Sequence, residues 1–318
     1  MTSDRMLLGL VAAIWLAAWV GLALPLEVAI WLFAPLVLVR RGIELARQCD
    51  GSPRERILLA TANHVQLPAA TILAVSFALP RGKAAATLAI PWLFVTLLLA
   101  ATGLGRLVRC GLRIDAKLAI SASLVLVAVG GGWGVLSRLG SRPQNFSDEI
   151  VLLTAIHFHY AGFVLPLLAG LSVRRRVKPR PIPPSLAERA VLLGVVLGVP
   201  AVGLGISLSP HLEVVSAVIL AIACIVVAVQ QLLRAAESRE ATRLALAGVA
   251  AAALVAGMSL AAAYAVGEFW GARWLDIPTM IRTHGVCNAF GFAACGLAVA
   301  RVQCEQSSSP CAPSSFSS

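Results

Sequence analysis

The sequence predicts an all-α fold: a polytopic bundle of about ten transmembrane helices with both termini in the cytoplasm. Hydrophobic residues make up 59% of the 318 residues and charged residues only 13%, which is about half the charged share of a soluble domain. Apolar segments long enough to cross a hydrocarbon core of about 30 Å recur along the whole chain. The basic residues gather in every second loop, and this pattern sets the orientation.

The predicted spans follow one another with short loops. The first begins after Arg5 and has some features of a signal peptide, but it lacks a clear small-x-small cleavage site, so we expect a retained helix. The second is the shortest and contains Glu27 and Pro35. In chain order the ten predicted spans are 6–22, 24–39, 57–79, 84–105, 118–136, 150–173, 187–208, 212–233, 244–266 and 278–300.

The net charge of +11 reflects topology rather than nucleic-acid binding. With a cytoplasmic N-terminus, twenty of the 26 basic residues fall on the inner side, which is the asymmetry of the positive-inside rule. We therefore expect a plasma (inner) membrane protein and no nucleic-acid partner. The six basic residues predicted on the outer side are Arg81, Lys83, Arg138, Arg142, Arg273 and Arg282.

The chain divides into four predicted regions. Residues 1–173 form an N-terminal six-helix membrane part, and residues 187–301 form a C-terminal four-helix membrane part. Between them, residues 174–186 are a basic, proline-rich cytoplasmic linker with polyproline-like character. Residues 302–318 are rich in Ser and Pro and are predicted to be a disordered tail. The glycines at 130–132 and 134 predict a close helix contact or a helix break rather than a phosphate loop.

Two polar strings lie inside apolar spans and locate a candidate site. Residues 154–163 contain His157 and His159, and residues 283–292 contain His284 and Asn288. Ionisable groups at membrane depth are costly and mark functional sites by default. Both spans are predicted to enter from the outside, so these side chains are expected in the outer half of the bundle.

Helical spacing determines which of these side chains can meet. His284 and Asn288 are four residues apart and share a face, whereas His157 and His159 point roughly 200° apart. We therefore favour His157 over His159 as the histidine that faces the site. The topology also brings carboxylates to the outer side, among them Glu27 at the start of the second span and Asp276 before the tenth.

This set of residues suits acid–base chemistry. Histidine titrates near neutrality, so His157 and His284 are candidates for general base and acid. Asn288 is a candidate hydrogen-bond donor to a developing oxyanion, and Glu27 or Asp276 a carboxylate that orients an imidazole. A variant of the same site holds a divalent metal, zinc or iron, through His157, His284 and a carboxylate.

The two strings also resemble a known family. They read HFHYAGF at 157–163 and HGVCNAFGF at 284–292, and both are similar to the YndJ-like family of bacterial multi-pass membrane proteins. The resemblance implies a polytopic membrane protein with these strings in two of its helices. It carries no settled activity, so the reaction stays open.

Three functions fit the sequence. The first is a membrane-embedded enzyme (a hydrolase, isomerase or cyclase) that acts on a lipophilic small molecule. The second is a transporter or permease with the same groups as its binding site and His64 as a proton relay. The third is an accessory membrane protein in which the polar groups only bridge helices. The sequence does not decide among them, nor does it fix the oligomeric state.

Overall fold

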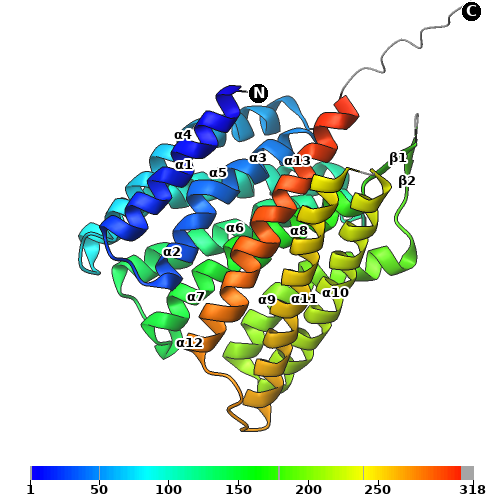
Figure 1. Ribbon diagram of the computed structural model, residues 1–318. Helices are drawn as coiled ribbons and strands as arrows, with labels where there is room; N and C mark the ends of the chain where they lie inside the picture. The colour runs from blue at the N-terminus through cyan, green and yellow to red at the C-terminus, as the bar shows by residue number, and fades with distance from the viewer. Residues whose placement is uncertain (1, 50, 178–179, 239, 309–318) are drawn as a thin grey trace, which may run out of the picture.

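The computed structural model describes residues 2–49, 51–177, 180–238 and 240–308, which form one bundle of helices (Figure 1). The start of α1 and the end of α13 lie at the same end of the bundle. The elements in chain order are α1 Thr2–Gly21, α2 Leu26–Phe33, the π-helical segment η1 Ala34–Leu38, α3 Val39–Arg47, α4 Pro53–Ser76, α5 Lys83–Cys110, α6 Ala116–Leu139, the 3₁₀ turn η2 Pro143–Asn145, α7 Asp148–His159, the π-helical segment η3 Tyr160–Val164, α8 Leu165–Val173, β1 Arg175–Val177, β2 Arg180–Ile182, α9 Leu186–Leu208, α10 Pro210–Glu237, α11 Ala241–Phe269, α12 Ile277–Met280, the π-helical segments η4 Ile281–Gly285 and η5 Cys287–Ala294, and α13 Cys295–Ser308.

Eight helices in the described part of the chain are long and apolar enough to cross a membrane. They are α4, α5, α6, the continuous helix 148–173, α9, α10, α11 and the continuous helix 277–301. These correspond to the last eight predicted spans. The first two predicted spans are also helical, as α1 and as α2–η1–α3. Within the described residues α1 contributes the shorter apolar helix Gly9–Gly21, and the second carries Glu27, Arg40 and Arg41.

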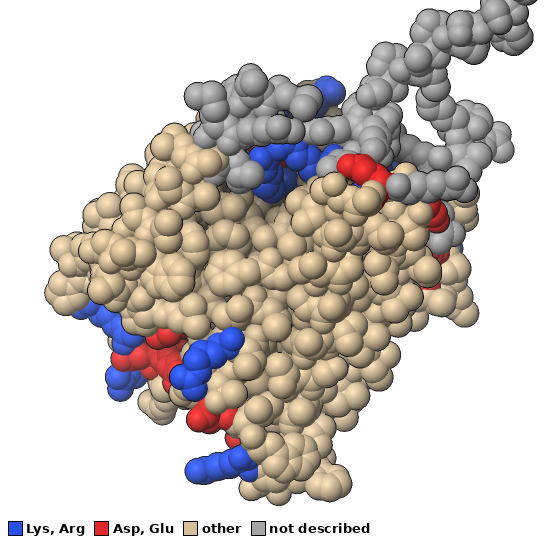
Figure 2. Space-filling model, in the orientation of Figure 1, with Lys and Arg blue, Asp and Glu red and all other residues tan. Residues whose placement is uncertain are grey.

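The charges lie at the two ends of the bundle. Figure 2 shows a wide band of uncharged residues on this face, with Lys, Arg, Asp and Glu side chains above and below it. Large apolar side chains such as Phe94, Ile219 and Val249 are exposed within the spanning helices. An exposed apolar belt between charged ends is what a bilayer requires of a helical membrane protein.

The predicted polyproline-like linker contains a short β-hairpin. Strand β1 pairs with β2 in antiparallel register, with Arg175 opposite Ile182 and Val177 opposite Arg180. Helix α9 then begins at Leu186 behind a capping box formed by Ser185 and Glu188. At the other end of the chain α13 continues to Ser308, into the predicted tail, and residues 309–318 lie outside the described part.

Three of the four glycines of α6 are positions of close helix contact, and Gly132 is not. A Cβ atom on Gly130 would lie 2.7 Å from Nδ1 of His159, and one on Gly131 would meet Thr96. A Cβ atom on Gly134 would lie 2.5 Å from the Trp31 ring. Each of these three glycines therefore admits a side chain of another helix that any larger residue would exclude.

The π-helical segments free backbone carbonyls for side chains of other helices. In η1, Pro35 has no N–H, and the N–H of Val39 donates to Ala34 rather than to Pro35. The Pro35 carbonyl instead accepts a hydrogen bond from Nε2 of Gln66 in α4. One turn earlier, the carbonyl of Ile30 accepts from the Tyr160 hydroxyl at 2.7 Å. Segment η5 packs against both η1 and η3, so the three irregular helices meet inside the bundle.

We expect Tyr160→Phe to destabilise the protein by about 1–2 kcal/mol, because the buried carbonyl of Ile30 would lose its side-chain donor. The matched control is Tyr264→Phe, which changes the other of the two tyrosines in the chain. Among the described residues the Tyr264 hydroxyl has no hydrogen-bond partner. Denaturant unfolding of the purified protein measures both, and equal stability losses would contradict the role given to Tyr160.

Candidate functional site

His157 and His284 lie side by side and bring together two helices far apart in the sequence. Their ring centroids are 6.1 Å apart and their planes differ by 23°, so the rings are stacked. His157 follows the start of its span at Asp148 by nine residues, and His284 follows Ile277 by seven. At a rise of 1.5 Å per residue, the two rings lie about 14 Å and about 10 Å along their helices, at similar depth.

Backbone carbonyls fix the proton position on both rings. Nδ1 of His157 donates to the carbonyl of Leu153 at 2.8 Å, and Nδ1 of His284 donates to the carbonyl of Gly257 at 2.8 Å. Because a carbonyl only accepts, each neutral ring carries its proton on Nδ1 and a lone pair on Nε2. The side chain of His157 is exposed at the surface of the chain, and its Nε2 has no hydrogen-bond partner among the described residues.

Asn288 holds the His284 ring. Its amide nitrogen donates to the carbonyl of His284 at 2.9 Å and lies 3.1 Å and 3.4 Å from the two ring nitrogens. Similar distances to both ring nitrogens place the amide over the ring rather than at one corner. The amide nitrogen of Asn288 is therefore directed at His284.

Two glycines let α11 come close to the tenth predicted span. A Cβ atom on Gly257 would lie 2.7 Å from the Asn288 amide nitrogen, and one on Gly291 would lie 2.3 Å from Cβ of Ala253. The same close approach puts the Gly257 carbonyl within reach of His284. The π-helical segments η4 and η5 carry both His284 and Asn288, and such segments are frequent at functional sites.

His159 lies apart from this pair, in the core. Its Nδ1 donates to the carbonyl of Ala155 at 2.7 Å, and its Nε2 accepts from the indole N–H of Trp92 at 2.9 Å. The ring stacks on Trp92 at 5.8 Å and is fully buried. Both ring nitrogens are therefore occupied, and His159 joins helices rather than facing a substrate.

The two predicted carboxylates occupy different places. Asp276 caps α12: its Oδ1 accepts from the N–H of Thr279 at 2.8 Å. Hydrogen bonds from the Thr279 side chain and backbone lower the pKa of Asp276, which is exposed. Glu27 lies half-buried in the first turn of α2, which packs against η4, and has no recorded hydrogen bond or ion pair among the described residues. Neither carboxylate is seen to orient an imidazole.

Within the described ranges, no group of three or more His, Cys, Asp or Glu side chains is arranged to hold a metal ion. His157 and His284 are close enough to each other, but no third ligand accompanies them.

The two remaining histidines stand alone. His64 is exposed on α4, and its Nδ1 donates to the carbonyl of Ala60 at 2.7 Å, within its own helix. His211, at the start of α10, packs edge-on against Phe269 with ring centroids 5.0 Å apart. His64 reproduces the local hydrogen bond and the exposure of His157 without a second imidazole, which makes it a matched control.

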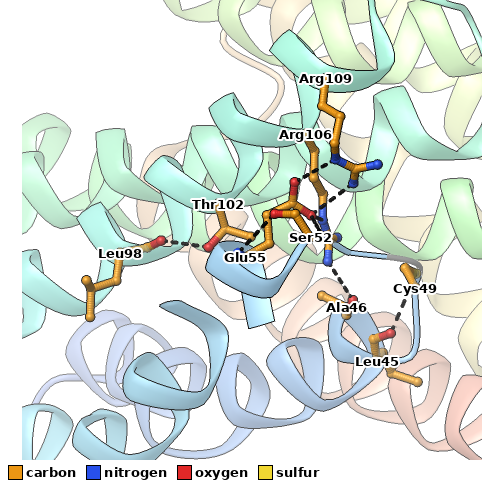
Figure 3. A network of polar contacts seen from close by, with 9 residues as sticks. All are labelled: Leu45, Ala46, Cys49, Ser52, Glu55, Leu98, Thr102, Arg106 and Arg109. Atoms are coloured by element: carbon orange, nitrogen blue, oxygen red, sulfur yellow. Dashed lines mark hydrogen bonds and ion pairs between the residues drawn. The ribbon is translucent and has the colours of Figure 1, made fainter. Parts of the chain in front are cut away.

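The structure also contains a buried ionic network that the sequence analysis did not predict (Figure 3). It lies at the end of the bundle opposite to α12. Glu55 accepts hydrogen bonds from Nε of Arg106 at 3.3 Å and from Nε of Arg109 at 3.0 Å, and Arg106 also donates to the carbonyl of Ala46. Glu55 and Ser52 form a capping box at the start of α4. The spacing Ser52-x-x-Glu55 is the signature of such a box and could have identified the helix start, but not the two arginines.

Comparison with known proteins identifies the family. The model of the YndJ-like protein family matches residues 29–292, which is most of the chain and includes both histidine strings. The chain belongs to the YndJ-like family. Over 168 residues it is 32% identical to the uncharacterized membrane protein YndJ of Bacillus subtilis (strain 168), a match that covers 53% of this chain. The chain spans 30% of the length of that relative. No solved structure matches it significantly. It is thus a multi-pass membrane protein of the YndJ-like family.

Proposed function

We propose that this YndJ-like protein is a membrane-embedded enzyme in which His157, stacked against His284, exchanges protons with a lipophilic substrate. The observation that carries the proposal is the Nε2 of His157, which has no hydrogen-bond partner among the described residues and lies beside a second imidazole held by the Gly257 carbonyl. A histidine that served only to bridge helices would use both ring nitrogens, as His159 does.

The protonation states suggest the order of events. Both rings begin neutral with Nδ1–H, so His157 first acts as a general base and takes a proton on Nε2. The resulting imidazolium then serves as the acid that returns a proton to another atom of the substrate. His284 lies stacked against it, and Asn288 and the Gly257 carbonyl hold His284 in place. This sequence fits a hydrolase that activates water, an isomerase or a cyclase.

The depth of the pair favours a lipophilic substrate. His157 is exposed at the surface of a spanning helix, about 14 Å from the start of that helix. A bilayer core is about 30 Å thick, so this surface faces hydrocarbon rather than water. A substrate dissolved in the bilayer reaches His157 by lateral diffusion, whereas a water-soluble one would first have to enter the apolar belt.

We further propose that both termini are cytoplasmic and that α1 and α2–η1–α3 are the first two of ten crossings. The continuous helix from Leu26 to Arg47 and the 20-residue α1 are each about 30 Å long, enough to cross the core. The start of α1 and the end of α13 lie at one end of the bundle, as an even number of crossings requires. A protease-cleavable tag at either terminus should be cut in inside-out vesicles and protected in intact cells; the reverse would overturn the assignment.

The test of function uses protein in nanodiscs made from a total lipid extract of Bacillus subtilis, the source of the relative. Mass spectrometry of the lipids before and after incubation is expected to show conversion of one lipophilic component by the wild type. His157→Ala and His284→Ala should each slow that conversion by about 10²–10⁴-fold, the usual contribution of a general acid–base group.

The control is His64→Ala, which removes an exposed histidine with the same Nδ1 bond to its own helix. It should leave the conversion rate within about twofold of the wild type. An unchanged lipid profile with folded wild-type protein, or equal conversion by wild type and the double variant His157→Ala/His284→Ala, would overturn the proposal.

A further inference from the structure

We propose that the end of the bundle where α3, α4, α5 and α6 meet binds the headgroups of anionic phospholipids. Five exposed cations form this surface, called here the arginine-rich end: Arg47, Arg54, Arg56, Arg113 and Lys117. The inference concerns the opposite end of the molecule from α12 and is independent of the proposed acid–base chemistry.

A buried ionic network holds the arginine-rich end together (Figure 3). Glu55 and Arg106 are each only 5% exposed in their side chains, and their charged atoms are 3.3 Å apart. Arg106 also donates to the carbonyl of Ala46 at 3.0 Å, so the last turns of α3 and α5 are tied to the first turn of α4. The exposed cations next to these turns are therefore presented by a fixed scaffold rather than by loose loops.

The nearby described carboxylates are already engaged. Glu44 pairs with Arg40 and Arg41 within α3. Glu55 is enclosed by its two arginines, and Asp115 caps α6 by accepting from the N–H groups of Lys117 and Leu118. The side chains of the five exposed cations consequently have no carboxylate partner in the described ranges, where they form a surface of positive charge.

At the end of the bundle near α12, the cations lie close to carboxylates of the protein. There Asp148 pairs with Arg81 and Arg142, whose Nε lies 2.7 Å from the carboxylate, and this pairing raises the pKa of Arg142. Asp276 lies close enough to Arg282 for the cation to lower its pKa. Cations at that end are thus partly neutralised by the protein itself, and the two ends have different affinity for anions.

The position of the arginine-rich end indicates which anion it meets. Arg54 and Arg56 lie in the first turn of the spanning helix α4, Arg113 lies between the spans α5 and α6, and Lys117 lies in the first turn of α6. The ends of spanning helices lie at the level of the lipid headgroups, where basic residues attract phosphate-bearing anionic lipids. The headgroups of such lipids are therefore the anions that this surface encounters at the highest concentration.

The experiment measures the thermal unfolding midpoint of the full chain in nanodiscs of phosphatidylcholine alone and of phosphatidylcholine with about a quarter phosphatidylglycerol. For the wild type we expect the anionic lipid to raise the midpoint by roughly 2–4 °C, and high salt to remove most of that rise. In the variant R54Q/R113Q the rise caused by phosphatidylglycerol should be at most half of the wild-type rise. The matched variant K83Q/R273Q removes two exposed cations at the other end, and its midpoint should rise as much as that of the wild type.

Two results would overturn the proposal: no rise with phosphatidylglycerol in the wild type, or an equal loss in the two variants. Inorganic phosphate added to protein in pure phosphatidylcholine distinguishes the source of the anion. We expect no shift from phosphate, and a rise as large as that given by the lipid would contradict binding of an intact headgroup. Because the wild-type salt dependence is measured on unmodified protein, the test holds even where a variant folds poorly.

Discussion

Replacing Glu55 with alanine is expected to destabilise the protein by about 3–5 kcal/mol. The Glu55 carboxylate accepts from Arg106, Arg109 and the backbone N–H of Ser52. Its removal leaves the guanidinium of Arg106 buried without a counter-ion, and it also removes half of the capping box of α4. Reversible unfolding in mixed detergent micelles measures this loss.

The control for this change is Glu44→Ala, which removes a carboxylate from α3 at the same end of the bundle. Glu44 is 28% exposed and pairs only with Arg40 and Arg41 of its own helix. Exposed pairs of this kind contribute about 0.3–1 kcal/mol. A Glu55→Ala protein no less stable than Glu44→Ala would contradict a structural role for the buried network.

Replacing His159 with alanine is expected to destabilise the protein by about 3–5 kcal/mol. The change leaves a cavity beside the Trp31 and Trp92 rings and removes the acceptor for the buried indole N–H of Trp92. His159→Phe fills most of the cavity but still leaves that N–H unpaired, so it should recover part of the loss and no more.

The contrast with His157 separates a structural histidine from a functional one. His157 is exposed and its Nε2 has no partner among the described residues, so His157→Ala should change the unfolding free energy by no more than about 1 kcal/mol. Similar losses for His157→Ala and His159→Ala would indicate that both histidines serve packing. In that case the acid–base proposal would lose its basis.

Periodicity and hydropathy predicted most of the helices. Their signal is local, because a run of some 20 apolar residues must form a helix wherever lipid surrounds it. The π-helical segments were not predicted. They depend on Pro35 and on the side chains of Tyr160 and Gln66, which donate hydrogen bonds to free carbonyls only once distant helices have packed.

The candidate site, like the fold, could be predicted from the sequence only where local helical spacing determines the geometry. Two-residue spacing on one helix was enough to expect His157 and His159 to face different neighbours, and the structure places them so. The partners themselves could not be derived from spacing, because Trp92 and Gly257 are far from their histidines in the sequence.

The most direct test of the central claim is ¹⁵N nuclear magnetic resonance of histidine-labelled protein in nanodiscs at neutral pH. The account predicts an unprotonated Nε2 on both His157 and His284, and a change in the ring resonances of His284 when His157 is replaced by Phe. His159 should not respond to that replacement, because its ring nitrogens are bound to Ala155 and Trp92. An Nε2 proton on His157, or His284 resonances indifferent to His157→Phe, would contradict the account of two coupled imidazoles with a free base.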